Sequence, residues 1–414
     1  MLAKKDGECF VLPCTKVSDF PVAEHRGVMI DLARGTKPFD EFVEDIILIA
    51  KMKMNYLHLH IFDSQGLAVE LDSLPVECYI KNYYTKEEMR QVIELADVLA
   101  LELIPEFDMP AHSKKLVECF SELGCDTEEK NTGWAICAGE EKAYELYEGI
   151  INELANMFPG EYLHIGGDEI EFGDIPHLEY LCHWNSCKKC IQKCNEEGIK
   201  DRQELYYYFI LRIYDIVKKT GKKMVMWSDQ LDCSKEIPLP KDILMQFWRV
   251  AAEGRGPVDG CSMEAQMDAG YTLINSCYEY VYGDLEEYMN TDKIIDWHWA
   301  NCSKDKSEAE DKIIGSEFCA WEYGNKEKCS HYEYTFAPSV VVMADKLWNG
   351  DKLNFTDEYQ KAVTKALLGC LTPDDLNLFK CFGAVIPPKD DSLAYFENIK
   401  CDKAEFLKVT SKNS

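Results

Sequence analysis

The stretch Leu163-His164-Ile165-Gly166-Gly167-Asp168-Glu169 is an apolar run that leads into two glycines and then two acidic residues. A short apolar run bounded by glycine is typical of a buried strand, and the polar residues after it lie at the strand's carboxyl end. Similar runs recur along the chain, each followed by a longer segment of helical periodicity. We expect strands near 28–32, 56–62, 101–107, 162–165, 224–227, 243–247, 271–274 and 314–320, with helical patterns such as 39–52, 86–99 and 204–219 between them.

This alternation predicts the α/β class, with parallel strands joined by crossover helices, and eight such units predict a closed (β/α)8 TIM barrel. An open doubly wound sheet is the alternative, but no Gly-x-Gly-x-x-Gly follows the first strand and no P-loop is present. We expect a short N-terminal segment over 1–24, a catalytic barrel over 25–350 and a helical appendage over 351–414.

The composition narrows the class of partner and the compartment. The chain has 414 residues and a formal net charge of -29, which argues against nucleic acids and anionic membranes as partners. Nineteen cysteines without a regular framework do not fit a fully disulfide-paired secreted module. The N-terminus lacks the apolar region of a signal peptide, so we expect a cytoplasmic protein, although removal of a leader would leave the same sequence.

Several residues with useful chemistry lie at or just after predicted strand ends, on the face where barrel active sites are built. These residues are Arg34, Asp63, Asp108, His112, Asp168, Glu169, Trp227, Trp248, Tyr280 and Trp321. Asp168 and Glu169 are adjacent carboxylates, and paired acids in unlike surroundings are how a glycosidase obtains an acid and an anion. A surface turn or an acidic helix N-terminus is the structural alternative for the same pair.

Four ordered motifs resemble the signatures of family 20 glycoside hydrolases, the β-N-acetylhexosaminidases. They are the segments His25-Arg26-Gly27-Val28-Met29-Ile30-Asp31-Leu32-Ala33-Arg34, His58-Leu59-His60-Ile61-Phe62-Asp63, Pro105-Glu106-Phe107-Asp108-Met109-Pro110-Ala111-His112 and His164-Ile165-Gly166-Gly167-Asp168-Glu169. Later segments around Trp227, Trp248, Tyr280 and Trp321 are similar to the family as well. The resemblance runs from about residue 26 to residue 348.

The resemblance implies a retaining mechanism in which the substrate's own 2-acetamido oxygen attacks the anomeric carbon. Glu169 is then the general acid/base, and Asp168 is the anion that orients the acetamido N–H. Tyr280 matches the tyrosine that donates to the acetamido oxygen, and His112 with Asp63 matches the pair that supports the general acid. We expect the pKa of Glu169 to be raised as a consequence.

The same resemblance assigns sugar-binding roles to Trp227, Trp248 and Trp321, whose flat faces would wall the acetamido group and the ring. It assigns the ring hydroxyls to Arg26, whose guanidinium presents a fixed fork of donors. We therefore expect an exo-β-N-acetylhexosaminidase acting on terminal β-linked GlcNAc or GalNAc of a small oligosaccharide or glycoconjugate, with no cofactor and no catalytic metal.

The chain departs from the family pattern at the residues that meet the outer hydroxyls of the sugar. After Tyr280 the family places a leucine and an aspartate, whereas this chain has Val281 and Tyr282. The family's Trp-x-Glu is shortened, because Glu322 directly follows Trp321. Tyr282 and Glu322 are therefore candidate substrate contacts, and the gluco or galacto preference stays open. The chain also resembles the compact members that lack the small α/β domain before the barrel.

Two other interpretations remain open. A sugar-binding barrel without activity would keep the aromatic walls, and a metal-dependent deacetylase would use His58, His60 and Asp63 as ligands.

Separately, Cys182, Cys187, Cys190 and Cys194, with His183 beside them, are a plausible tetrahedral zinc set, while a helical run of unpaired thiols is the alternative. Such a zinc ion would stabilise a loop and take no part in hydrolysis.

Overall fold

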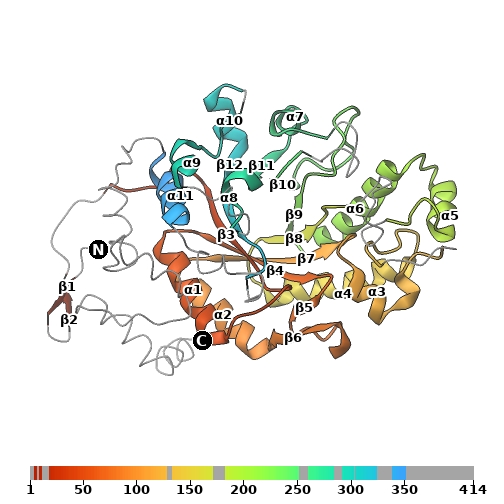
Figure 1. The fold of residues 1–414 in the computed structure, drawn as a ribbon, viewed down its shortest axis with the longest axis horizontal. Coiled ribbons are helices and arrows are strands. Elements are labelled where there is room, and N and C mark those ends of the chain that lie inside the picture. Colours follow the sequence, from red (N-terminus) through yellow and green to blue (C-terminus); the bar gives the residue numbers. More distant parts are fainter. Residues whose placement is uncertain are drawn as a thin grey trace.

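The computed structural model describes residues 4–6, 9–11, 18–127, 133–170, 182–250, 260–283, 291–302, 304–323 and 338–350. Eight parallel strands form a closed ring, in which β12 pairs with β3 and β3 pairs with β4 (Figure 1). In ring order the strands are β3 (His25–Asp31), β4 (Tyr56–Asp63), β7 (Glu102–Met109), β8 (Tyr162–Gly166), β9 (Lys223–Trp227), β10 (Leu244–Phe247), β11 (Thr272–Asn275) and β12 (Ile313–Ala320). Each overlaps one predicted strand, so the TIM barrel is confirmed and the open sheet is wrong.

Helices follow the strands and lie around the ring (Figure 1). They are α1 (Phe39–Lys51), α2 (Lys86–Val98), α3 (Lys114–Cys119), α4 (Glu141–Met157), α5 (Lys188–Glu197), α6 (Arg202–Lys219), α7 (Met263–Asp268), α8 (Tyr278–Val281), α9 (Thr291–Asp296), α10 (Lys306–Lys312) and α11 (Pro338–Asn349). Their first residues are set by local signals. At α2, for example, the Thr85 hydroxyl accepts the Glu88 backbone N–H while the Glu88 carboxylate accepts the Thr85 N–H, which is a capping box.

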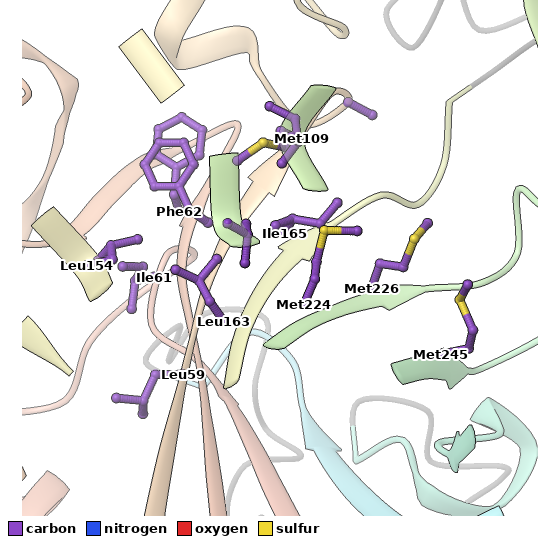
Figure 2. Packing of buried hydrophobic residues seen from close by; sticks show 14 of the residues in the cluster. Leu59, Ile61, Phe62, Met109, Leu154, Leu163, Ile165, Met224, Met226 and Met245 are labelled. Atoms are coloured by element: carbon purple, nitrogen blue, oxygen red, sulfur yellow. The ribbon is translucent and has the colours of Figure 1, made fainter. Parts of the chain in front are cut away.

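The main core lies between the strands and the helices, because strand side chains alternate between the two faces. In β4, Leu59 and Ile61 belong to this core, while His58 and His60 point into the barrel interior, where they meet carboxylates from other strands. Figure 2 shows Leu154 of α4 among the strand residues Leu59, Ile61 and Leu163. Burying one such leucine stabilises the fold by about 1.5–3 kcal/mol.

Smaller elements are attached to the ring. β5 (Gly66–Val69) pairs antiparallel with β4 and is followed by β6 (Tyr79–Tyr84), while β1 (Lys4–Asp6) and β2 (Cys9–Val11) form a separate two-stranded sheet. Two short 3-10 helices span Val76–Cys78 and Ser121–Leu123. The predicted appendage over 351–414 lies outside the described residues.

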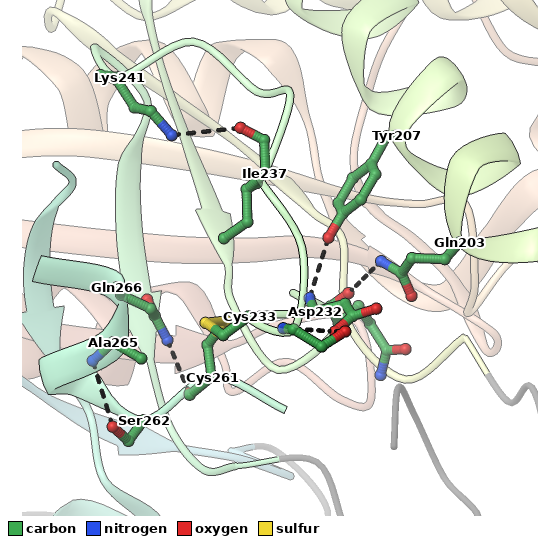
Figure 3. The surroundings of a disulfide bond; sticks show 12 residues. Gln203, Tyr207, Asp232, Cys233, Ile237, Lys241, Cys261, Ser262, Ala265 and Gln266 are labelled. Atoms are coloured by element: carbon green, nitrogen blue, oxygen red, sulfur yellow. Dashed lines mark hydrogen bonds between the residues drawn. A yellow bond between two sulfur atoms is a disulfide. The ribbon is translucent and has the colours of Figure 1, made fainter. Parts of the chain in front are cut away.

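A disulfide joins Cys233, after β9, to Cys261, before α7 (Figure 3). The adjacent Asp232 backbone N–H donates to the Tyr207 hydroxyl at 3.0 Å, which ties this segment to α6. Eleven other cysteines in the described part of the chain are free thiols. Among the residues that the structure describes, no helix has the length and apolar content that a membrane crossing needs.

Candidate active site

The carboxyl ends of the eight strands bring most of the predicted site residues to one rim of the barrel. Asp63 ends β4, Asp168 and Glu169 follow β8, and Trp227 ends β9. The loops after the other strands at this rim carry Arg34, His112, Trp248, Trp321 and Glu322, and Tyr282 directly follows the short helix α8 after β11.

Two glycines place the carboxylates there. Gly166 and Gly167 have φ of 70° and 100°, a region that side chains rarely adopt. A Cβ at Gly166 would lie 1.8 Å from Oδ1 of Asp108, so only glycine lets β8 approach β7 this closely. The Tyr206 hydroxyl then fixes the turn by donating to the Gly167 carbonyl at 2.7 Å.

His112 faces both carboxylates of the predicted catalytic pair. Its Nε2 lies 3.7 Å from Oδ2 of Asp168 and 3.6 Å from Oε2 of Glu169. On the other side of the ring, Nδ1 lies 3.1 Å from Oδ2 of Asp63. The structure therefore brings together the four residues Asp63, His112, Asp168 and Glu169, as predicted.

The pKa values of the pair differ from the expected order. Burial raises the pKa of the Asp168 carboxyl to about 7, against the opposing charge of His112. Burial acts in the same direction on Glu169, but the hydrogen bond from His112 and the charges of His112 and Arg249 outweigh it and leave the pKa of Glu169 below its usual value. The predicted raised pKa of Glu169 is therefore wrong, because His112 lowers it and a cation that the sequence analysis missed lowers it further.

That cation is Arg249, directly after Trp248. Its Nη2 lies 3.1 Å from Oε1 of Glu169, and its guanidinium stacks on the Trp248 ring, 4.0 Å from the ring centre. The sequence did contain an indication of this role, because Arg249 is a charged residue just beyond a predicted strand end, where the active-site residues of barrels lie.

Two further neighbours of Glu169 were also missed. The Glu169 backbone N–H donates to Oδ2 of Asp229 at 3.2 Å, and Trp134 Nε1 donates to the Glu169 carbonyl at 3.0 Å. The Trp134 ring also packs on the His112 ring at a centroid distance of 4.4 Å. These contacts hold the Glu169 backbone, whose φ is 49°, in a left-handed conformation.

Aromatic rings form a wall beside the carboxylates. Trp321 packs on Trp227 at a centroid distance of 5.9 Å, and Tyr282 stacks on Trp248 at 5.9 Å with 12° between the planes. Within the described chain, Nε1 of Trp248, Nε1 of Trp321 and Oδ1 of Asp168 are buried without a hydrogen-bond partner. Buried polar atoms are almost always paired, so these three atoms are available to a polar ligand at the wall.

Tyr280 does not join this wall, and its predicted placement is wrong. Its ring stacks on Trp297 at 5.9 Å and 23°, and the side chain is only partly buried. Tyr282, two residues further on, is the tyrosine that packs against Trp248 and Trp321. The short helix α8 turns Tyr280 away from the wall, which the sequence motif alone does not reveal.

The predicted sugar contact Arg26 is also wrong. It lies at the start of β3, on the opposite rim, where Nη1 donates to the Ala23 carbonyl at 2.9 Å and Nε donates to the Lys53 carbonyl at 3.0 Å. Arg34 follows the carboxyl end of the same strand. Its guanidinium donates to Asp63 at 2.6 Å and lies over the Trp321 ring, 5.0 Å from the ring centre.

Glu322 lies close to Arg34. Its backbone N–H donates to Oδ2 of Asp31 at 2.8 Å, and Asp31 also binds Arg34 at 2.9 Å. The φ of Glu322 is 59°, so the residue occupies the left-handed region that usually favours glycine.

The barrel interior below the rim holds an ion network. His58 lies 3.0 Å from Glu317 and 3.1 Å from Glu106, while His164 lies 3.0 Å from Glu106. These carboxylates raise the pKa of His58 to about 9 despite its burial. His60 pairs with Glu106 and Asp63, so among the described residues His58, His60 and Asp63 do not meet as one set of three ligands. The geometry does not favour the metal-dependent deacetylase.

Comparison with known proteins gives one family. Residues 24–351 match the sequence model of the catalytic domain of glycosyl hydrolase family 20. A β-hexosaminidase of Porphyromonas gingivalis is 27% identical over 240 residues, which cover 53% of this chain and 30% of that protein. A β-hexosaminidase of Vibrio furnissii is 25% identical over 329 residues, which cover 72% of this chain and 50% of that protein. The chain thus spans half or less of the length of these two relatives.

The fold has a matching solved structure. The crystal structure of an exo-β-N-acetylglucosaminidase from Vibrio harveyi, in complex with N-acetylglucosamine, matches with a TM-score of 0.71 at 22% identity. The match covers 92% of this chain and 62% of that one. At this identity the likeness bears on the fold.

Proposed function

The chain belongs to glycosyl hydrolase family 20, and we propose that it is a retaining exo-β-N-acetylhexosaminidase that hydrolyses terminal β-linked GlcNAc or GalNAc. The observation that carries this proposal is the position of His112 within 3.7 Å of both Asp168 and Glu169, beside a wall of aromatic rings. A small oligosaccharide or a glycoconjugate with such a terminal sugar is the proposed substrate.

In the proposed reaction, Glu169 protonates the departing glycosidic oxygen while the substrate's acetamido oxygen attacks the anomeric carbon. Asp168 accepts the acetamido N–H and stabilises the oxazolinium ion that forms. Water, deprotonated by Glu169, then opens this ion and restores the β configuration. Oδ1 of Asp168, buried and without a partner within the described chain, is the atom that we assign to the acetamido N–H.

The remaining donors divide between the acetamido group and the ring hydroxyls. We assign the acetamido oxygen to the hydroxyl of Tyr282, because Tyr282 belongs to the aromatic wall and Tyr280 does not. Arg34 replaces Arg26 as the donor to ring hydroxyls, since its guanidinium lies at the rim over the Trp321 ring. Glu322, next to Arg34, is the proposed contact for an outer hydroxyl.

The test is Glu169→Gln with two substrates that differ in their leaving group. If Glu169 is the proton donor, kcat/KM should fall by about 10²–10⁴-fold on a chitobiose-type disaccharide and much less on a dinitrophenyl N-acetyl-β-glucosaminide, whose leaving group needs no proton. Glu87→Gln, on the exposed face of α2, is the matched control. Equal losses on both substrates would contradict the assignment of Glu169 as proton donor.

A second test addresses substrate participation. A glycoside with a 2-hydroxyl in place of the 2-acetamido group should be almost inert, because it lacks the attacking oxygen. Comparable turnover of the two glycosides would rule out this mechanism.

A sugar-binding barrel without activity is the second candidate. It is favoured by the ion pair between Arg249 and Glu169, which stabilises the carboxylate and so opposes the protonated form that a general acid needs. Binding of N-acetylglucosamine in calorimetry, together with no release of nitrophenol from the aryl glycoside, would support this candidate.

We also propose a cytoplasmic location, which the eleven free cysteines among the described residues support. The disulfide between Cys233 and Cys261 is the opposing observation. If a thiol reagent labels both Cys233 and Cys261 in freshly lysed cells, the result would support a cytoplasmic location. An intact disulfide between them would count against it.

A further inference from the structure

Four buried cysteines gather away from the carboxylates, beside the first turn of α5. The sulfur atoms of Cys125, Cys137, Cys187 and Cys190 all lie within 4.8 Å of one another. Cys137 Sγ is 3.5 Å from Cys187 Sγ and 3.6 Å from Cys190 Sγ. These distances are well beyond a disulfide bond of about 2.05 Å. They are close to the sulfur separation of about 3.8 Å that four Zn–S bonds of about 2.3 Å give in a tetrahedron.

The cluster is built from two connections of the barrel. Cys125 and Cys137 belong to the connection between β7 and α4, whereas Cys187 is the N-cap of α5 and Cys190 lies in its first turn. The last two form a Cys-x-x-Cys pair, a spacing common in structural zinc sites. The cluster shares only Cys187 and Cys190 with the set suggested by the sequence, because Cys182 and Cys194 are not part of it.

The backbone around the cluster is held in place independently of the sulfur atoms. Cys137 N–H donates to the Leu123 carbonyl at 2.9 Å, and Lys188 N–H donates to the Asp126 carbonyl at 3.2 Å. A Cβ at Gly139 would lie 2.4 Å from the carbonyl carbon of Lys189, so a glycine is required where the two connections touch. Four thiols are therefore presented on a preformed frame, as a metal site needs.

We propose that Cys125, Cys137, Cys187 and Cys190 bind one zinc ion as a closed structural site. Four thiolates complete a tetrahedron and leave no position for water, so the site is structural and does not hydrolyse substrate. Binding releases the thiol protons to solvent, and no redox step takes place. Thiolate ligands in this number select zinc over magnesium or calcium, which prefer oxygen ligands.

The zinc site also supports the candidate active site through Trp134. This residue is three positions before Cys137, and its carbonyl accepts the Ser113 N–H at 3.0 Å. Its indole N–H binds the Glu169 carbonyl, and its ring packs on His112. Loss of zinc would leave this connection held by its backbone hydrogen bonds alone, so Trp134 and the two residues that it contacts, His112 and Glu169, should be less firmly fixed.

The test is metal analysis of the full chain, purified without chelators from a medium that contains zinc and iron. Mass spectrometry of the metal content should find one zinc per chain. Cys190→Ser should reduce the zinc content several-fold, and Cys194→Ser, one turn further along the same helix and outside the cluster, should leave it unchanged. Cys125→Ser, on the other connection, should behave like Cys190→Ser.

A titration of the unmutated protein keeps the test independent of how the variants fold. A mercurial reagent that modifies thiols should release one zinc per chain, detected with a chromogenic chelator. Iron in place of zinc, disulfides among the four cysteines in alkylated peptides, or equal zinc in Cys190→Ser and Cys194→Ser would overturn the proposal. Because none of these readouts uses sugar cleavage, an inactive enzyme would leave the result intact.

Discussion

Gly166→Ala should be among the most damaging small substitutions in the barrel, for reasons that separate into two parts. The first part is the backbone, because φ at this position is 70° and an alanine there costs about 1–2 kcal/mol. The second part is overlap, because the new Cβ would lie 1.8 Å from Oδ1 of buried Asp108. Forcing one extra carbon into a packed site costs about 1–3 kcal/mol. Together the free energy of unfolding should fall by about 2–5 kcal/mol.

Gly221→Ala is the matched control for the backbone part alone. Its φ is 83°, and nothing lies within 4 Å of the added Cβ. This variant should lose only about 1–2 kcal/mol. Urea unfolding of both variants, followed by tryptophan fluorescence, gives the difference directly.

The same substitution should also lower activity, because the displaced Asp108 side chain lies next to Asp168. Burial raises the pKa of Asp108, and the negative charge of Asp168 raises it further. Equal stability losses for Gly166→Ala and Gly221→Ala would refute the argument that a close approach of β8 to β7 makes glycine necessary.

Three further predictions concern the carboxylate site and are measured by steady-state kinetics on an aryl N-acetyl-β-glucosaminide. Burial raises the pKa of Asp168 to about 7 while that of Glu169 is lowered, so just below pH 7 the pair holds one proton, mainly on Asp168. The productive form is the minor one that carries this proton on Glu169, and because loss of the proton removes both forms, kcat/KM should fall as the pH rises above about 7. A decline that begins only far above this pH would contradict the assignment. Arg249→Gln removes a cation 3.1 Å from Glu169, so the pKa of Glu169 should rise and this decline should move to higher pH, which an unchanged pH profile would disprove. Arg34→Lys should raise KM by about tenfold through loss of a charged hydrogen bond, whereas Arg26→Lys, on the opposite rim, should leave KM unchanged. The reverse result would restore Arg26 as the residue that binds the ring hydroxyls.

Much of the fold could be read from the sequence, because strand and helix periodicity are local properties. Leu57, Leu59 and Ile61 alternate with His58 and His60, and that alternation alone separates the outer core from the barrel interior. The pair Asp168–Glu169 was equally readable, since it directly follows a strand and the carboxyl ends of parallel strands share one rim.

The errors in the site have a common physical cause. Arg26 and Arg34 flank the same strand, and a motif that contains both does not say which one lies at the rim with the carboxylates. Tyr280 and Tyr282 are likewise two residues apart, and only the path of α8 decides which ring meets Trp248. Side-chain direction depends on packing between segments that the local pattern does not specify.

Two properties were set by tertiary structure alone. The pKa of Glu169 depends on His112 and on Arg249, and Arg249 lies 80 positions away in the chain and is brought to 3.1 Å by the barrel fold. The sequence by itself determined the Cys187-x-x-Cys190 pair, but it did not determine the partners Cys125 and Cys137, which come from an earlier connection. Local periodicity therefore determined the strands and the carboxylates, whereas charge environment and cysteine ligation required distant segments to meet in space.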